Sequence, residues 1–189
     1  AVITTQELIL MIKESGLEFS ELEPEAVDMP FGAISGAGVI FGVTGGVTEA
    51  VLRRVSESRS RESLLQAANA GQRGMEGIKE FYLPYGDRQL HIAVVSGLGN
   101  AERVLLRASA GEHFDFIEIM ACPGGCINGG GQPYSGKAKE ARSKGLYEAD
   151  RMQSIRRSQE NPIVNSVYKK IIKDRAHELL HVHYTKNHD

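Results

Sequence analysis

One stretch of this chain constrains its fold more than any other, because a strand-like run leads straight into a glycine-rich loop. The run FDFIEIMA is followed by CPGGCINGGGQP, which holds both cysteines of the chain, Cys122 and Cys126. A short apolar run bounded by turn residues is typical of a buried strand. Glycines let the backbone approach a neighbour that any Cβ would exclude. We therefore expect the two thiols just beyond the carboxyl end of a strand, where α/β proteins commonly place ligand sites.

The rest of the chain predicts strands that alternate with helices. Two strand-like runs, 78–85 and 88–97, are joined by Gly86 and Asp87, a pair suited to a hairpin turn. Apolar residues at helical spacing follow in 100–111. This alternation predicts an α/β fold with a mainly parallel central sheet flanked by helices.

Three segments of the N-terminal half give further structural signals. Thr4 and Glu7 form a capping-box pattern at the start of a helix that Gly16 ends. The glycine-rich segment 31–46 surrounds an apolar core at 39–41, which predicts a short buried strand. The helix after it is expected to turn four apolar residues inward, namely Val47, Ala50, Val51 and Val55.

The C-terminal end of the chain predicts helices only. An amphipathic, solvated helix is expected over 136–157, and two short helices over 162–173 and 176–184. We therefore expect residues 1–160 to form one domain and residues 161–189 to form a helical tail.

Composition excludes several classes of partner. The 189 residues have a formal net charge of −2, which gives no electrostatic reason to expect nucleic acid or an anionic membrane as a partner. No apolar run approaches the roughly 20 residues that a bilayer crossing needs. The first residues lack the basic and small-residue pattern of a signal peptide. Two cysteines cannot build a disulfide framework, so we expect free thiols in a reducing, cytoplasmic compartment.

Four interpretations of Cys122 and Cys126 compete. Redox disulfides usually separate their thiols by two residues and use a helix start, whereas three residues intervene here. Zinc would need two more ligands, which the tail could offer from His177, His181 and His183. An iron–sulfur cluster uses thiolates and nearby backbone amides, and so accounts for the glycines as well. Buried cysteines without a ligand are common, and the two cysteines alone support that alternative as well as they support the cluster.

A dinucleotide site is a weaker alternative elsewhere in the chain. Gly97, Leu98 and Gly99 follow a strand and precede a helix, and Glu118 lies near the spacing of a ribose-binding acid. The third glycine of that pattern is absent, and Glu102 in its place would repel a pyrophosphate. An ordinary strand-to-helix turn is the better prediction.

The stretch EIMACPGGCINGGGQP closely resembles the third cluster-binding motif of iron-only hydrogenases, the enzymes that interconvert dihydrogen with protons and electrons. Three further segments look like the later half of the same catalytic domain, in the same order: TTQELILMIKESG, FGAISGAGVIFGVTGGVTEAVLR and IRRSQENPIVNSVYKKIIKDRAHELLHVHY. The resemblance covers the whole chain. It implies the second lobe of a hydrogenase catalytic domain, with a tail similar to the family's small subunit.

The resemblance assigns roles by position. Cys122 would ligate a four-iron four-sulfur (4Fe-4S) cubane, and Cys126 would bridge that cubane to the two-iron subcluster where dihydrogen is split. The cubane and the subcluster together form the H-cluster. Four residues would line the pocket around the two-iron unit: Phe41, Gly42, Val47 and Met120.

The chain departs from the family pattern in its number of cysteines. The family's cubane takes four, and two of them come from earlier motifs that this sequence does not contain. The resemblance therefore implies two partners, the N-terminal half of the catalytic domain and a ferredoxin-like electron carrier, and no hydrogenase activity for the chain alone. Non-catalytic relatives that assemble iron–sulfur clusters share the cysteine motif and form the alternative within the superfamily.

Overall fold

The computed structural model describes residues 2–26, 28, 33–55, 72–73, 77–134 and 138–182. Within these ranges a three-stranded sheet has the order β1 (Ile78–Tyr85), β2 (Arg88–Ser96) and β3 (Phe116–Met120). The predicted hairpin is confirmed, since β1 and β2 pair antiparallel around Gly86, whose φ of +57° suits a tight turn.

The predicted α/β class is also confirmed, but the sheet is mixed. β2 and β3 pair parallel and are connected through helix α5 (Leu98–Ser109), as parallel neighbours require. The two-residue connection between β1 and β2 can join antiparallel strands only. The expectation of a mainly parallel sheet therefore holds for β2 and β3 and not for the sheet as described.

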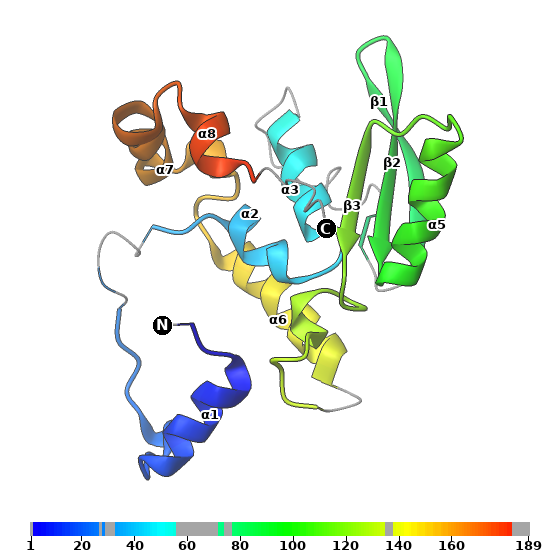
Figure 1. The fold of residues 1–189 in the computed structure, drawn as a ribbon. Coiled ribbons are helices and arrows are strands. Elements are labelled where there is room, and N and C mark those ends of the chain that lie inside the picture. The colour runs from blue at the N-terminus through cyan, green and yellow to red at the C-terminus, as the bar shows by residue number, and fades with distance from the viewer. Residues whose placement is uncertain are drawn as a thin grey trace, which may run out of the picture.

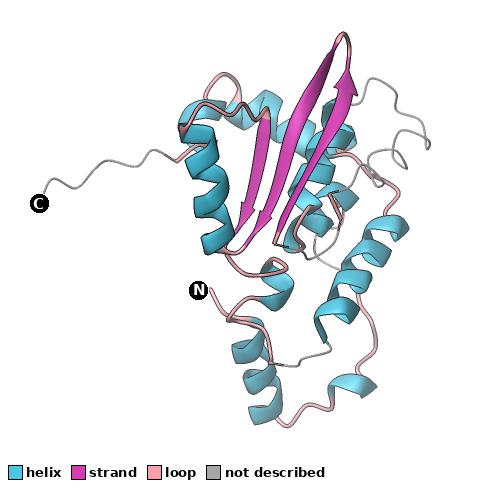
Figure 2. Ribbon diagram, turned by 90° about the vertical axis from the view of Figure 1, so that its right-hand side faces the viewer, coloured by secondary structure: helices cyan, strands magenta, loops and turns pink. Residues whose placement is uncertain are grey.

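Helices cover both faces of the sheet, with α5 on one side and α3 (Gly46–Val55) on the other (Figures 1 and 2). The central strand β2 is buried on both faces, because its residues point alternately toward the two helices. Toward α5 the core consists of Ala93, Val95, Ala101 and Val104, and toward α3 of Ile92 and Leu52.

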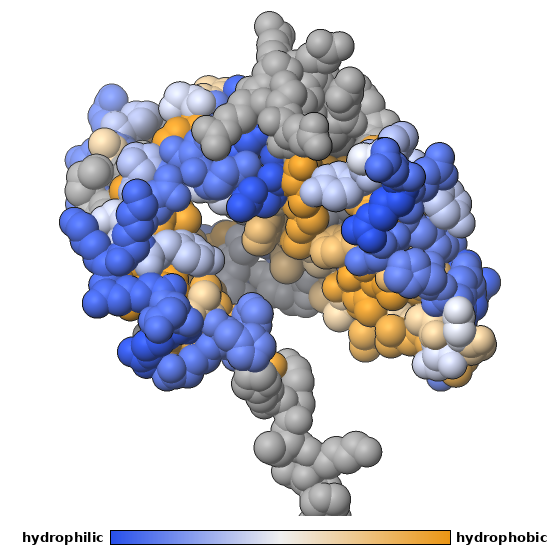
Figure 3. All heavy atoms as spheres, turned by 90° about the horizontal axis from the view of Figure 1, so that it is seen from above, coloured by the Kyte–Doolittle hydropathy of each residue, from blue (hydrophilic) through white to orange (hydrophobic). Residues whose placement is uncertain are grey.

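The two sides of the outer surface differ in hydropathy. Seen from above, the side that holds the sheet and α5 shows an apolar patch bordered by hydrophilic residues (Figure 3). Hydrophilic residues cover most of the opposite side, where α7 (Pro162–Val167) and α8 (Ala176–Leu180) lie (Figures 1 and 3). Helix α5 accordingly exposes three leucines, Leu98, Leu105 and Leu106.

The glycine-rich segment is helical, so the prediction of a strand at 39–41 is wrong. It forms a short helix, α2 (Gly36–Val39), and a 3₁₀ turn, η2 (Ile40–Gly42). The physical reason is its packing against α6 (Ala138–Met152), where a Cβ on Gly36 would lie 2.0 Å from Asp150 Oδ1. Its backbone amides donate hydrogen bonds to carbonyls within the segment and to carbonyls of the chain after α6. The segment therefore needs no neighbouring strand to satisfy its backbone.

Helix α3 is confirmed, but its buried face differs from the predicted one. The four expected apolar residues are half-buried. The fully buried positions include Thr48, Glu49, Leu52 and Arg53, three of which are polar. Burial of such groups is tolerated only where each finds hydrogen-bonding partners. Thr48 bonds Glu118 on β3, Glu49 bonds Arg53 and Arg73, and Arg53 also bonds Asp150 of α6.

A buried ion network joins α3 to α6. Arg53, whose side chain is 0% exposed, contacts Glu49 at 2.6 Å and Asp150 at 2.8 Å. Asp150 also accepts from Arg156 at 2.7 Å, and Glu49 accepts from Arg73 at 2.7 Å. Each of the two carboxylates contacts two guanidiniums, so the charges can remain buried.

Glu118 joins the sheet to α3. Its carboxylate, on β3, accepts hydrogen bonds of 2.6 Å from the Gly45 amide, the Thr48 amide and the Thr48 hydroxyl. A carboxylate at a helix start satisfies free amides and complements the helix dipole. The strand that leads to Cys122 is thereby fixed beside the end of the glycine-rich segment.

Near both ends the described residues form helices, although α8 (Ala176–Leu180) is shorter than the helix predicted over 176–184, of which 183–184 lie outside the described residues. Helix α1 (Thr5–Glu14) has the expected capping box between Thr4 and Glu7. Near the other end, α7 begins at the Asn161 cap and runs into a π-helical turn, η5 (Tyr168–Ile172), before α8. The remaining short turns are η1 (Phe19–Glu21), η3 (Cys126–Asn128) and η4 (Ser158–Glu160). None of the helices in the described ranges combines the length and apolar character that crossing a bilayer requires.

The buried ion network should stabilise the fold strongly. We expect Asp150→Asn to lower the free energy of unfolding by about 3–5 kcal/mol, because it leaves Arg53 buried with less compensating charge. Glu148→Gln on the same helix is the matched control, since the Glu148 side chain is 47% exposed and its pairs with Lys144 and Arg151 measure 3.8 and 3.6 Å. That control should stay within about 0.5 kcal/mol of wild type in urea unfolding. Equal losses in both variants would contradict the role given to the network.

The same network should make stability depend on pH. Burial alone would raise the pKa of Asp150, but hydrogen bonds from Arg53 and Arg156 outweigh it and hold the pKa below its ordinary value. A carboxyl with a lowered folded pKa stabilises the fold fully above its unfolded pKa of about 3.9, and that stability is lost progressively as the pH falls from there through the lower folded pKa. We expect the urea midpoint of wild type to fall between about pH 5 and pH 3. The same decline should be shallower in Asp150→Asn, and parallel profiles would refute the assignment.

Candidate metal centre

The cysteine loop begins where β3 ends. Met120 is the last strand residue, and its carbonyl accepts from the Gly97 amide at 2.7 Å. The Gly125 amide donates to the Cys122 carbonyl at 2.9 Å and closes a tight turn between the cysteines. Gly124 and Gly125 both have a φ of +90°, which residues with a side chain rarely adopt. The turn therefore depends on glycine and sets Cys126 at the start of η3.

The glycine-rich segment forms the base of this loop. A Cβ on Gly125 would lie 2.7 Å from the Gly42 carbonyl oxygen and 2.9 Å from the Thr44 nitrogen. The Thr44 amide donates to the Gly124 carbonyl at 3.2 Å, and the Gly124 amide donates to Ser96 Oγ at 2.8 Å. Two backbones are in direct contact here, and only glycine at position 125 permits it.

Helix α1 holds the glycine run that follows. Gln6 donates from its backbone amide to the Gly131 carbonyl at 3.0 Å. Its side-chain amide donates to the carbonyls of Gly130 at 2.9 Å and Gln132 at 2.7 Å. Segments more than 120 residues apart in sequence are joined by one side chain.

Helix α6 supports the loop from a further direction. Arg142 donates to the carbonyls of Ile127 at 3.0 Å and Pro133 at 2.7 Å. Ile127 packs with Ile40 and Val43 in a small buried cluster beneath the loop. Hydrogen bonds and apolar packing thus hold the loop, which makes it a preorganised site.

The two thiols are free, with Cys122 half-buried and Cys126 exposed. No disulfide joins them in this structure, and neither residue is a buried core cysteine. A Cβ on Gly129 would lie 3.7 Å from Cys122 Sγ, so this glycine keeps the space beside the sulfur open. The amides of Gly125 and Gly129 donate to carbonyls within the loop, so these two are not available to a sulfur ligand.

This donor set fits an iron–sulfur cluster in part. Thiolates are the normal ligands of such clusters, and two free cysteines stand on one rigid loop beside glycine backbone. Two thiolates are half of the usual four. The loop is thus suited to hold one side of a cluster whose other ligands come from elsewhere.

The residues expected to line the pocket lie on the elements around this loop. Gly42 is brought against it, as the contact with Gly125 shows. Met120 precedes the loop directly and is half-buried. Phe41 is 47% exposed in η2, and Val47 is half-buried in the first turn of α3. Their role toward a cofactor stays a prediction.

The zinc alternative fails for the part of the chain that the structure describes. His183 lies outside the described residues. His177 and His181 approach each other, with their Nδ1 atoms 2.6 Å apart, on exposed positions. Where side chains are described, the one group of three metal-type donors within 4.8 Å of one another contains neither cysteine.

Several residues that organise the loop had no signal in the sequence. Gln6, Ser96 and Arg142 are ordinary helix or strand residues, and their contacts depend on segments distant in the chain. Glu118 did have a signal, but its buried carboxylate bonds the start of α3. It is therefore a structural cap, which agrees with the rejection of a dinucleotide site.

Two family models match consecutive parts of the chain. Residues 1–130 match the family model of the iron-only hydrogenase large subunit, C-terminal domain, and residues 132–187 match that of the iron hydrogenase small subunit. The chain is 45% identical to the NADP-reducing hydrogenase subunit HndD of Solidesulfovibrio fructosivorans, over 98% of this chain and 33% of that protein. It is 38% identical to iron hydrogenase 1 of Clostridium pasteurianum, over 98% of this chain and 34% of that protein. The chain thus spans about a third of these relatives.

Solved structures indicate the same family as the sequence comparisons. The apo [FeFe]-hydrogenase HydA1 of Chlamydomonas reinhardtii, variant C377H, superposes with a TM-score of 0.67 at 36% identity, covering 97% of this chain and 54% of that one. A more distant relative is the bovine (Bos taurus) cytosolic iron-sulfur assembly component 3, 28% identical over 97% of this chain and 40% of that protein. The chain belongs to the iron-only hydrogenase family and corresponds to a C-terminal part of its large subunit.

Proposed function

We propose that this chain is the C-terminal half of a hydrogenase catalytic domain that, in the complete enzyme, reversibly oxidises dihydrogen to protons and electrons. The observation that supports this most directly is the cysteine loop, in which two free thiols stand on a turn held by the glycine-rich segment, α1 and α6. Such support keeps both sulfur donors in place before any metal binds.

Cys122 would ligate the 4Fe-4S cubane, and Cys126 would join the cubane to the two-iron subcluster. When bound, the H-cluster supplies the open coordination position at which the bond of dihydrogen is broken. Thiolate ligation sets the charge at this site, and Gly129 leaves room beside Cys122 for a bulky ligand.

Four further residues of this chain would form the wall of the same pocket. Met120 offers a soft thioether, and Phe41 and Val47 offer apolar surface that excludes water. Gly42 adds no side chain to the wall, and its carbonyl oxygen lies against Gly125. A dry wall lowers the local dielectric and so tunes the potential of a bound cluster.

The N-terminal half of the domain would provide the other two cysteines. The exposed apolar side chains support this, because α1 leaves Leu8, Leu10 and Met11 open to solvent and Phe41 stands beside the loop. Large exposed apolar side chains in groups mark surfaces that another part of a protein covers. A ferredoxin-like carrier in the cytoplasm would exchange electrons with the assembled enzyme. Residues 161–189 of this chain would form a small-subunit-like tail of that enzyme.

The second candidate is an iron–sulfur assembly protein without hydrogenase activity. It is supported by the similarity to the bovine assembly component over nearly the whole chain. The higher identity to two hydrogenases favours the enzyme. Hydrogen production separates the candidates, because both would hold iron and sulfide but only the hydrogenase would evolve hydrogen.

We expect the 189-residue chain alone to evolve no hydrogen, since two thiolates supply half of the ligands that a cubane uses. The complete protein, anaerobically reconstituted with iron, sulfide and the two-iron unit, should evolve hydrogen from reduced methyl viologen, as measured by gas chromatography. Hydrogen from the chain alone would refute the proposed division. A complete protein that binds clusters and makes no hydrogen would favour the assembly candidate.

The glycine at position 125 offers a second test in the complete protein. We expect Gly125→Ala to lower bound iron and acid-labile sulfide several-fold, because its positive φ costs about 1–2 kcal/mol and its Cβ would meet the Gly42 carbonyl at 2.7 Å. Gly130→Ala is the matched control, since a Cβ there meets nothing within 4 Å. Equal iron content in the two variants would show that the close approach at position 125 is not needed for cluster binding.

A further inference from the structure

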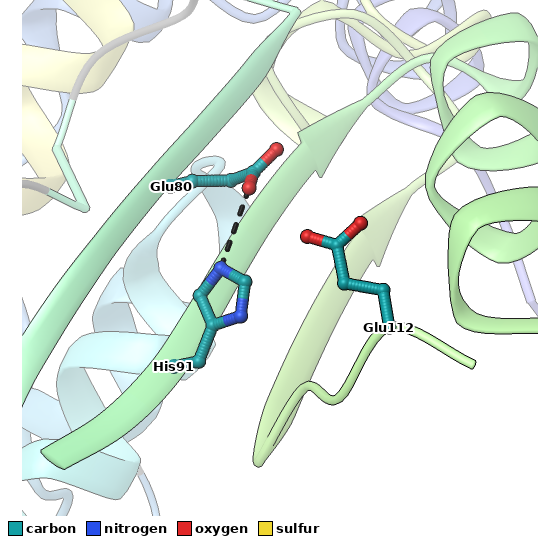
Figure 4. A group of neighbouring side chains, drawn as sticks. All are labelled: Glu80, His91 and Glu112. Atoms are coloured by element: carbon teal, nitrogen blue, oxygen red, sulfur yellow. Dashed lines mark hydrogen bonds and ion pairs between the residues drawn. The ribbon is translucent and has the colours of Figure 1, made fainter. Parts of the chain in front are cut away.

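Three metal-type donors converge at the end of the sheet that lies away from the cysteine loop. Glu80 comes from β1, His91 from β2 and Glu112 from the connection between α5 and β3 (Figure 4). One ligand atom of each lies within 4.8 Å of the others. His91 stands near the start of β2, whereas Ser96, at its end, contacts the cysteine loop. The group is therefore separate from the hydrogenase site.

The imidazole of His91 is fixed in place. Its side chain is 9% exposed and is stacked between Tyr82 and Phe114, with ring centroids 4.5 and 4.4 Å away. Its Nδ1 lies 2.8 Å from the His113 carbonyl oxygen, which can only accept a hydrogen bond. Nδ1 must therefore hold a proton. A ring oriented by Nδ1–H against a backbone carbonyl is the usual arrangement of a metal-binding histidine.

The other ring nitrogen faces a carboxylate. Nε2 of His91 lies 3.3 Å from Glu80 Oε2 (Figure 4). With Nδ1 protonated, a neutral ring presents a lone pair to an oxygen that also has lone pairs, so the contact needs either a proton on Nε2 or a metal ion between the two atoms. A spacing of about 3.3 Å is the edge of a tetrahedron with metal–ligand bonds of about 2.0–2.1 Å.

Arg107 neutralises the cluster only in part. It donates to both carboxylates, to Glu80 at 2.9 Å and to Glu112 at 2.7 Å. Two carboxylates and one guanidinium leave one net negative charge when His91 is neutral. The side chains of Arg107 and Glu112 are 41% and 38% exposed, so both can rearrange toward solvent.

We propose that Glu80, His91 and Glu112 bind a divalent transition-metal ion of the zinc type, and that Arg107 is the internal cation that the metal displaces. Imidazole nitrogen and carboxylate oxygen are suitable ligands for zinc, with water in the fourth position. The ion would join the β1–β2 hairpin to the connection after α5, two parts of the domain that contact each other at this end of the sheet.

Zinc binding by the whole 189-residue chain tests this, measured by titration calorimetry with Zn²⁺ alone. The parent variant is Cys122→Ser, Cys126→Ser, His181→Ala, which removes the thiolates and the exposed histidine pair as competing ligands. We expect Glu112→Gln to weaken zinc binding by at least about 10-fold, the effect of removing a group that supports a metal. Glu102→Gln, exposed on α5 and outside the cluster, should leave the affinity within about twofold.

Arg107→Gln should change the zinc affinity in the opposite direction to Glu112→Gln. If Arg107 competes with the metal, its removal should tighten zinc binding, whereas a cluster that is only a network of ion pairs would gain nothing. Cobalt in place of zinc should give visible absorption bands in the parent, and these should be lost in Glu112→Gln. Failure of the parent to bind zinc, or equal affinities in Glu112→Gln and Glu102→Gln, would overturn the proposal.

Discussion

The backbone contact between Gly125 and the Gly42–Thr44 segment is the constraint on which the rest of the site depends. Two turns from opposite halves of the chain meet there without any side chain between them. The contact gives the cysteine loop a rigid base and places Gly42 against it. Because a single Cβ would separate the two backbones, the geometry of the site rests on the absence of side chains at a few positions.

Polar interactions maintain this contact where an apolar core is thin. Glu118 fixes the start of α3 to β3, and the Arg53 network fixes α3 to α6. The apolar cluster beneath the loop is small, with Ile40, Val43 and Ile127 as its buried members. With so few apolar residues buried beneath the loop, directed ionic bonds define its internal geometry instead.

Much of the fold was predictable where the signals are local. The capping box at Thr4, the hairpin at Gly86 and the helical spacing after Asn100 depend on neighbouring residues, and all three are confirmed. The strand predicted at 39–41 and the inward face predicted for α3 were wrong because each depends on distant partners. Asp150 fits against Gly36 and bonds Arg53, and no periodicity in 36–55 reports a carboxylate about a hundred residues away.

The sequence by itself determined the class of the fold, the family and the loop that presents both thiols, because strand and turn propensities and an ordered set of motifs are local properties. Only the tertiary structure decided what holds the loop: the carbonyls taken by Gln6 and Arg142, the glycine contact at position 42 and the cap formed by Glu118. It also decided that Glu80, His91 and Glu112 meet. Such contacts join residues that are far apart in the chain, and chain order contains no information about their separation in space.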